Sequence, residues 1–466
     1  MCDRLYLENM AKKHTSPPKL SVHFIGIGGI GISALARWFS AQNWVVSGSD
    51  LTESLVTESL RKSGVRLKIG HKAANLPRKL DMVVYSVAVH KDNPEFREAV
   101  RRNLKPLSYP EVIGCLTKLY KTVAIAGSHG KSTTTAMVGL ILTRAGLDPN
   151  VVVGTNLKEF RNRNFRFGRS KWLVLEADEW RASFLNYHPF VSVITNIDKE
   201  HLDYYRTFSR VKNTFISFLK NTQRGGCLVL NRDDKTLYSL RSPINQLAKK
   251  NSLRVLWYSR DGLNARSIAK KLKIAGEHNL SNALAALGVA KVLGIKSRIA
   301  MREVLNYRGA WRRMEFKGNC QISGIRCKIF DDYAHHPTEI MATLRAFREM
   351  FPNSPVVCVY QPHQIERLKA LFKEFVGAFL DAHVIVFLPI YEVAGRDRSS
   401  QSFTSERLAR VIFKKYPRKH VFYLKNPKQL KSFLKHTVQH LGFTNSPIIV
   451  MMGAGNIVNL TPRLLS

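Results

Sequence analysis

The chain of 466 residues lacks any long uncharged apolar run. A membrane-spanning helix needs about 20 predominantly apolar residues, so no membrane insertion is predicted. The start of the chain, MCDRLYLENMAKKHTSPPKL, also lacks the apolar stretch of a signal peptide. A cytoplasmic protein is therefore the expectation.

Acidic residues are scarce, with 34 Asp and Glu against 73 Lys and Arg, and the net charge is +39. Such a charge raises the local concentration of polyanions. The basic residues are spread along the chain, however, and no signature of a nucleic-acid-binding module accompanies them. A nucleic-acid partner is thus disfavoured. A polyanion-binding protein stays open as an alternative, and binding that collapses steeply with salt would identify it.

Cysteine forms no recognisable motif. The six cysteines include no CxxC pair and no spacing typical of metal ligands. Hydrophobic residues make up 45% and charged residues 23% of the chain, as in ordinary folded globular proteins. The length favours about three domains of ~150 residues each.

The first part of the chain predicts a Rossmann-like domain at residues 20–118, after a flexible leader at 1–19. The leader is polar and contains two consecutive prolines. After it, VHFIGIGGI is typical of a buried strand that runs into a glycine turn, and SALARWFSAQ of the following helix. The next strand is WVVSGSD. This β-α-β alternation favours a parallel sheet.

The same alternation continues to the end of the chain. KTVAIAG predicts a strand and STTTAMVGLILTRAG a helix, which begin a central P-loop-type ATPase domain with a parallel sheet at 119–311. Strands and helices alternate again at 312–466, where a helix is expected up to about Leu380. The fold class is therefore α/β, and the third domain is also expected to be Rossmann-like.

A phosphate-binding loop is the strongest local motif. It consists of Gly127, Ser128, His129, Gly130, Lys131, Ser132 and Thr133. It follows an apolar strand and precedes a helix, so its N–H groups and the helix N-terminus can cradle phosphates. Lys131 would neutralise phosphate charge, and the Ser132 hydroxyl would reach Mg²⁺. Ile125 stands where GxxxxGK[ST] has its first glycine, which indicates a variant of the ordinary loop.

A second glycine loop occurs near the N-terminus, with Gly26, Gly28 and Gly31 in the pattern GxGxxG. Asp50 lies 19 residues after Gly31, at the end of the next strand. This arrangement is the dinucleotide fingerprint with its ribose-binding acid. A dehydrogenase would leave the phosphate loop at 127–133 unexplained. The N-terminal glycine loop therefore predicts binding of a nucleotide of unspecified kind. A nicotinamide-binding assay would distinguish a dehydrogenase from another nucleotide-binding protein.

Polar residues also follow two strands of the central domain. These are Glu176, Asp178 and Glu179 in EADE, and Asn196, His201 and Asp203 in TNIDKEHLDYY. Ligands of open α/β sheets bind at the carboxyl ends of strands. Carboxylates and an imidazole beside a phosphate loop suit Mg²⁺. Each of them could equally be a structural cap or a satisfied core group.

The chain resembles the Mur ligase family. The motifs that carry the resemblance are GSHGKSTT, EADE followed by SFL, TNIDxEHLDYY, GEHNLSNALAAL, RRMEF, DDYAHHPTEI, YQPHQxER and MGAGNI, in that order. The likeness extends from about Ser21 to the end. It implies ATP-dependent ligation of L-alanine to the lactyl carboxylate of UDP-N-acetylmuramate, in peptidoglycan precursor synthesis. Family members that attach a whole tripeptide share most of these motifs, so that substrate remains an alternative.

The resemblance also implies roles for particular residues. Those implied in catalysis are Lys131, Glu176, His201, Arg313 and His363. Those implied in ATP binding are the loop residues 127–133 with Asn279, Asp332 and Tyr333. Those implied in binding the other substrates are Gly26, Gly28, Gly31, Asp50, His71, Ser86, His335 and Arg367. Those implied at the metal are Ser132, Glu176 and His201. ATP and Mg²⁺ are the implied cofactors, and the protein would be a monomer or homodimer.

One departure from the family pattern concerns the residues after EADE. The family's usual small polar and acidic residues are replaced by Trp180 and Arg181. This change puts the detail of substrate recognition in doubt more than catalysis. A family member that binds nucleotide without turnover is a further alternative, but Lys131, Ser132 and Asn279 are all retained.

Overall fold

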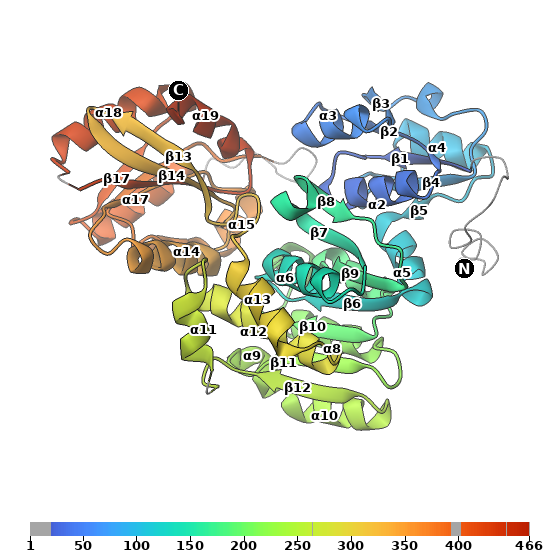
Figure 1. Ribbon diagram of the computed structural model, residues 1–466. Coiled ribbons are helices and arrows are strands. Elements are labelled where there is room, and N and C mark those ends of the chain that lie inside the picture. The colour runs from blue at the N-terminus through green and yellow to red at the C-terminus, as the bar shows by residue number, and fades with distance from the viewer. Residues whose placement is uncertain (1–19, 263, 393–401, 444, 466) are drawn as a thin grey trace. The chain divides into compact units, whose positions relative to one another are not determined.

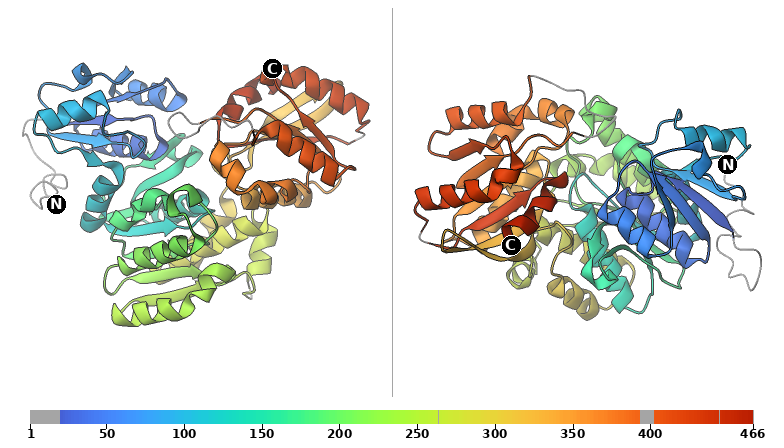
Figure 2. Two further views of the ribbon diagram at one scale, coloured as in Figure 1. Left: turned by 180° about the vertical axis from the view of Figure 1, so that it is seen from behind. Right: turned by 90° about the horizontal axis from the view of Figure 1, so that it is seen from above.

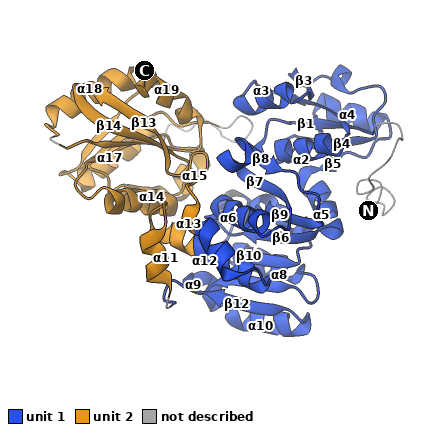
Figure 3. Ribbon diagram, viewed as in Figure 1, with its two compact units in different colours: residues 1–262, 282–304 blue, residues 263–281, 305–466 orange. Residues whose placement is uncertain are grey.

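The computed structural model describes residues 20–262, 264–392, 402–443 and 445–465. The predicted leader at 1–19 lies outside the described residues. The described chain contains three β-sheets with helices between their strands, which confirms the predicted α/β class (Figure 1). By their contacts, residues 1–262 and 282–304 form one compact unit, and residues 263–281 and 305–466 form another (Figure 3). The division at 20–118, 119–311 and 312–466 stays a proposal.

The first sheet has the strand order β3-β2-β1-β4-β5 and is parallel throughout. Its strands are β1 (Ser21–Ile25), β2 (Val45–Asp50), β3 (Arg66–Ile69), β4 (Met82–Tyr85) and β5 (Leu107–Ser108). Its helices are α2 (Ile30–Ala41), α3 (Leu55–Lys62), η1 (Ala73–Asn75), α4 (Pro94–Arg101) and α5 (Tyr109–Leu119). Four consecutive residues of β1 are buried, as expected of a central strand covered on both faces.

The second sheet has the order β12-β11-β10-β6-β9-β7-β8. Its strands are β6 (Lys121–Ala126), β7 (Asn150–Leu157), β8 (Arg163–Arg166), β9 (Trp172–Glu176), β10 (Val191–Ile194), β11 (Cys227–Asn231) and β12 (Arg254–Tyr258). The predicted parallel pairing is confirmed except at β8, which pairs antiparallel with β7. Because β6 lies between β10 and β9, the phosphate loop and both predicted polar segments leave neighbouring strands.

The helices that follow β6 along the chain, up to the start of the third sheet, vary in length. They are α6 (Lys131–Arg144), η2 (Lys158–Phe160), η3 (Trp180–Asn186), α7 (Leu202–Tyr205), α8 (Phe208–Lys220), α9 (Lys235–Ser239), α10 (Arg241–Lys250), α11 (Ala265–Lys271), α12 (Glu277–Val292) and α13 (Ser297–Asn306). Within the first compact unit, one hydrophobic core continues from the first sheet to the second, from Phe24 and Trp38 to Phe184 and Phe215. These two sheets are therefore packed together by apolar burial.

The third sheet has the order β13-β14-β18-β15-β16-β17, with only β13 antiparallel among its described strands. Its strands are β13 (Glu315–Ile322), β14 (Ile325–Asp332), β15 (Val356–Tyr360), β16 (Val384–Phe387), β17 (His420–Tyr423) and β18 (Ile448–Met452). Its helices are α14 (Pro337–Met350), α15 (Ile365–Ala370), α16 (Phe372–Gly377), α17 (Ser405–Lys415), η4 (Pro427–Gln429), α18 (Leu430–His440), η5 (Asn456–Leu460) and α19 (Thr461–Leu465).

Helices cover both faces of the third sheet (Figure 2). Cys358 and Tyr360 of β15 belong to one apolar core, whereas Val357 and Val359 belong to the other, as the alternation of a strand requires. The single helix expected up to about Leu380 is wrong, because the chain leaves helical geometry at Leu371 (φ −118°, ψ 24°) and forms α15 and α16 instead. Among the described residues, no helix combines the length and the apolar character needed to cross a membrane.

Candidate functional site

The phosphate loop joins β6 to α6 and depends on two glycines. Gly127 (φ 135°) and Gly130 (φ 82°) adopt backbone angles that side chains rarely permit. A Cβ at Gly127 would clash with Thr195 Oγ1, and one at Gly130 would clash with the Asn282 amide. Ile125 is still a buried strand residue, paired with Glu176 of β9, so this loop is shorter than GxxxxGK[ST] assumes.

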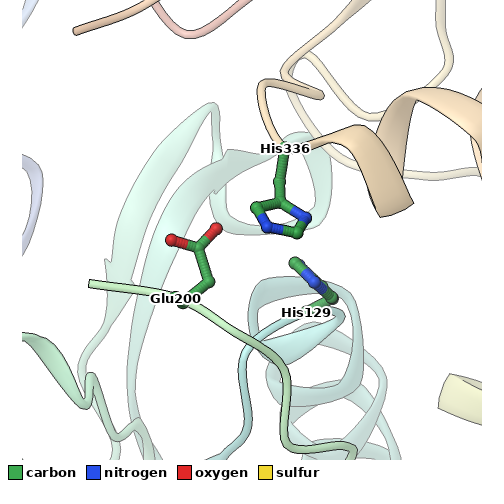
Figure 4. Close-up of side chains that lie close together, drawn as sticks. All are labelled: His129, Glu200 and His336. Atoms are coloured by element: carbon green, nitrogen blue, oxygen red, sulfur yellow. The ribbon is translucent and has the colours of Figure 1, made fainter. Parts of the chain in front are cut away.

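The segment after β10 holds the loop in place. Asn196 accepts from the His129 N–H (2.8 Å) and donates to the His129 carbonyl (3.0 Å). The Asp198 N–H donates to Ser128 Oγ (2.8 Å), and Asp198 Oδ2 lies 3.0 Å from His129 Nε2. A carboxylate oxygen of Glu200 is within 4.8 Å of a ring nitrogen of His129, and both side chains are drawn in Figure 4. The loop is therefore preformed.

Lys131, the first residue of α6, is largely buried among acceptors. Its Nζ donates to the Gly127 carbonyl (2.7 Å) and to Glu179 Oε2 (2.8 Å). Burial acts to lower the pKa of Lys131, but the carboxylates of Glu179, Asp178 and Glu176 outweigh it and raise the pKa above its ordinary value. The ammonium is thus charged throughout the physiological range, where it can neutralise a bound phosphate.

Ser132 and Glu176, two predicted metal ligands, lie together. Ser132 Oγ donates to Glu176 Oε1 (3.1 Å), while Glu176 Oε2 accepts from the Gly154 N–H (2.7 Å). A hydroxyl and a carboxylate are the oxygen donors that Mg²⁺ prefers, so these residues fit the ion. His201 groups instead with Asp178 and Glu179, with one ligand atom of each within 4.8 Å of the others.

Tyr109 joins the first glycine loop to this acidic cluster. Its ring lies against Gly31. Burial raises the pKa of Tyr109, and the negative charges of Glu176 and Asp178 raise it further, which places the ring near those carboxylates. Tyr109 therefore contacts the first glycine loop and lies within electrostatic range of Glu176 and Asp178.

The first glycine loop is surrounded by its predicted neighbours. The N–H groups of Gly26 and Gly28 donate to the Ser49 carbonyl (2.8 Å) and to Asp50 Oδ2 (2.7 Å), respectively. The Ser86 Cβ is close enough to contact a side chain placed at Gly26. His71 Nδ1 lies 2.9 Å from Ser49 Oγ. The ends of β1, β2, β3 and β4 thus bring these residues to one edge of the sheet.

Trp180 and Arg181, which follow EADE in the chain, begin η3. The Arg181 guanidinium stacks 4.8 Å from the Trp180 ring centre and donates to the Val87 carbonyl (3.0 Å), one residue after Ser86. Arg181 and Ala182 both have positive φ, 52° and 56°. The departure from the family pattern therefore adds a cation beside the first glycine loop.

In the second compact unit, several residues predicted to bind ATP lie near the end of β14. Arg313 forms an ion pair with Glu339 (3.7 Å) and lies over the Tyr333 ring (5.0 Å). Asp332 accepts from the N–H groups of Met314 and Ala334 (2.8 Å each). Burial raises the pKa of Asp332, partly offset by Arg313. Asp332 thus fixes the backbone that presents Tyr333.

His335 and His363 also lie near each other, with ring centres 6.1 Å apart. His335 Nδ1 is 3.0 Å from the Tyr333 carbonyl, and the His363 ring stacks on Tyr391. Arg367 lies on α15, four residues after His363. These residues come from the carboxyl ends of β14, β15 and β16, where ligands of parallel sheets bind.

Asn279 and His278 begin α12. The Asn279 side chain is buried and donates to the Ala275 carbonyl (2.7 Å). Burial lowers the pKa of His278 to about 4; Glu339 acts to raise it and Arg313 to lower it. His278 is therefore neutral at pH 7 in the folded protein.

We expect His278 to destabilise the protein in mild acid. Its folded pKa is about 4, below the ordinary value of 6.5, so between these pH values the unfolded chain binds a proton that the folded chain does not. The stabilisation is complete above pH 6.5 and is lost as the pH falls towards 4. From pH 7.5 to 5, wild type should lose about 2 kcal/mol relative to His278→Gln in chemical denaturation. A difference independent of pH would contradict the prediction.

Three contributors to these sites were not predicted to act as they do. Asp198 anchors the phosphate loop, Asn282 closes against Gly130 and Thr134, and Glu339 pairs with Arg313. Glu339 had a readable signal, since it stands three residues after His336 in a helix capping box. The partners of Asp198 and Asn282 are distant in sequence and gave no local signal.

Family profiles cover most of the chain. The profile described as "Mur ligase family, catalytic domain" matches residues 21–121. "Mur ligase middle domain" matches 125–290, and "Mur ligase, glutamate ligase domain" matches 312–455.

Individual proteins with similar sequences share one name. UDP-N-acetylmuramate–L-alanine ligase from Aquifex aeolicus is 40% identical over 413 residues, which are 83% of this chain and 87% of that protein. The protein of the same name from Trichlorobacter lovleyi is 37% identical and covers 94% and 96% of the two chains. The crystal structure of UDP-N-acetylmuramate-alanine ligase from Thermotoga maritima has the same fold, with a TM-score of 0.76, 24% identity, and coverage of 96% and 98%.

Proposed function

Because the chain belongs to the Mur ligase family, we propose that it joins L-alanine to the lactyl carboxylate of UDP-N-acetylmuramate, with conversion of ATP to ADP and phosphate. Relatives with this activity in their names cover most of the chain. The observation that carries the proposal is the preformed phosphate loop, in which a charged Lys131 lies beside the contact of Ser132 with Glu176.

The chemistry has two steps. A lactyl carboxylate oxygen attacks the γ-phosphorus of ATP, the bond from that phosphorus to the β,γ-bridging oxygen breaks, and ADP leaves. The amine of L-alanine then attacks the carbonyl carbon of the acyl phosphate, phosphate leaves, and the nitrogen loses its proton. Lys131 offsets the negative charge that gathers during phosphoryl transfer. An acyl phosphate hydrolyses in water, so residues of the third sheet would have to exclude water from the reacting groups.

Mg²⁺ is part of the proposal. Ser132 and Glu176 would hold it, since their oxygens already lie 3.1 Å apart. His201, beside Asp178 and Glu179, is proposed as a further ligand. The ion would supply positive charge to the phosphates when bound.

The remaining site residues divide between the substrates. Gly26, Gly28, Gly31, Asp50, His71 and Ser86 would bind the UDP group. Asn279, Asp332, Tyr333, Arg313 and His335 would close over ATP, and His363 and Arg367 would lie near the amino acid. We place the enzyme in the cytoplasm as a monomer or homodimer that acts in peptidoglycan precursor synthesis.

An ADP-release assay tests the proposal. With UDP-N-acetylmuramate and ATP, L-alanine should support turnover, and a tripeptide substrate should not. Hydroxylamine added before the amino acid should capture the acyl group as a hydroxamate. Turnover with the tripeptide alone would move the assignment to the tripeptide-attaching ligases of the family, and release of ADP with none of these substrates would contradict ligation.

A further inference from the structure

A buried carboxylate lies behind the first glycine loop. Glu95, in the first turn of α4, has no exposed surface. Its oxygens accept hydrogen bonds from Ser49 Oγ (2.6 Å), Asn75 Nδ2 (2.7 Å), His23 Nε2 (3.0 Å) and the Lys72 N–H (3.2 Å). These donors come from β1, β2 and the segment after β3, so Glu95 ties together the elements around the loop.

The donors keep Glu95 ionised. Burial alone would raise the pKa of Glu95, but hydrogen bonds from His23, His71, Ser49 and Asn75 outweigh it and lower the pKa well below its usual range. An ionised carboxylate only accepts hydrogen bonds. The hydroxyl proton of Ser49, 2.6 Å from Glu95 Oε2, is therefore committed to Glu95.

This commitment determines the proton position on His71. Ser49 has one proton, so its oxygen can only accept from His71 Nδ1, 2.9 Å away. His71 Nδ1 is also 3.4 Å from Glu95 Oε1. Both contacts require the proton on Nδ1. In a neutral ring Nε2 is then an acceptor, and within the described part of the chain it makes no hydrogen bond.

The same serine holds the glycine loop. The Ser49 carbonyl accepts from the N–H groups of Gly26 (2.8 Å) and Ile27 (2.9 Å), and the Asp50 carbonyl accepts from the Gly70 N–H (2.8 Å). Ser49 consequently links the His71 ring to the glycine loop: its side chain contacts the ring, and its backbone carbonyl binds the loop. Only about a tenth of the His71 side chain is exposed.

We propose that Glu95 is a positioning residue of the sugar-nucleotide site, which holds His71 as the Nδ1–H tautomer so that Nε2 accepts a hydrogen bond from the nucleoside. The matching ligand groups are a ribose hydroxyl or the uracil N–H. This inference rests on the proposed binding of UDP at the first glycine loop. Glu95 itself touches no ligand and acts through Ser49 and His71.

Calorimetric titration with UDP, without ATP or amino acid, tests the inference. Glu95→Gln has the same shape but presents an amide N–H₂ to the donors, so it should weaken UDP binding about tenfold, the effect of one lost hydrogen bond. Glu98→Gln is the matched control on α4, because Glu98 pairs with Arg101 and Arg102 at the surface. That control should bind UDP like wild type.

A double variant separates positioning from structural support. If Glu95 acts through His71, adding Glu95→Gln to His71→Ala should not weaken UDP binding further. Equal weakening in both backgrounds, or wild-type binding by Glu95→Gln, would overturn the inference. His71→Gln, which keeps an acceptor near the position of Nε2, should bind better than His71→Asn.

Nitrogen NMR of wild-type His71, recorded without and then with UDP, provides a readout that needs no variant. At pH 7.5, Nδ1 should be protonated and Nε2 unprotonated, and UDP should shift the Nε2 signal. A ring protonated at Nε2 contradicts the inference. Ligation and UDP binding are measured separately. If the protein binds UDP but does not ligate L-alanine, this test remains valid. If wild type does not bind UDP, both the proposed UDP site and the role of Glu95 are overturned.

Discussion

Lys131→Ala is expected to lower kcat for ligation at least about a thousandfold, the scale on which preorganised charge acts in a transition state. The Lys131 ammonium is the cation of the phosphate loop, within hydrogen-bond distance of the Gly127 and Ser128 carbonyls and of Glu179. Without it, the carboxylates of Glu176, Asp178 and Glu179 would repel the triphosphate. ADP release and product formation measure the effect.

The stability of this variant must be measured separately. Removal of Lys131 leaves Glu179, which is 1% exposed, without its partner, and breaking a buried pair costs about 3–5 kcal/mol. The double variant Lys131→Met with Glu179→Gln removes both charges, so it should regain much of that stability but no activity. Lys121→Ala, at the other end of β6, is the control and should remain active. Normal product formation by Lys131→Ala would refute the proposed phosphoryl transfer.

Local patterns were sufficient for the phosphate loop. The apolar run before Gly127 and the helix-forming run after Lys131 are readable without neighbours, and the structure places β6, loop and α6 as predicted. Ile125 shows the limit of the motif, because GxxxxGK[ST] assumes a longer loop, whereas the strand here continues to Ala126. The motif predicts a glycine at position 130, where φ is 82°, but the close approach of Asn282 to Gly130 could not be read locally because Asn282 is far along the chain.

Long-range pairing explains what the sequence could not predict. Lys131 and Glu179 meet because β6 and β9 are adjacent, although β7 and β8 lie between them in the chain. Similarly, Glu95 gave no signal as an isolated carboxylate, because its partners come from three separate segments of the chain. His201 was assigned to one metal set with Glu176, yet its left-handed backbone (φ 54°) starts α7 and its ring groups with Asp178 and Glu179.

Glu176→Gln is expected to lower kcat by about a hundredfold or more and to raise the Mg²⁺ concentration needed for half-maximal activity. Glutamine can still accept from the Gly154 N–H, which Glu176 Oε2 binds at 2.7 Å, so the fold should be retained. The side chain loses its negative charge, however, and turns an amide N–H₂ towards Ser132, where a cation would be held. Ser132→Ala should shift the Mg²⁺ requirement in the same direction.

Asp178→Asn decides which carboxylates hold the ion. Asp178 is exposed and groups with His201 and Glu179, whereas Glu176 contacts Ser132 at the start of α6, where phosphates are expected. If the Ser132 and Glu176 pair is the main metal site, Mg²⁺-dependent ATP binding by calorimetry should weaken far more in Glu176→Gln than in Asp178→Asn. The reverse order would move the metal to the group around His201, and the Ser132 hydroxyl would then serve only the phosphates.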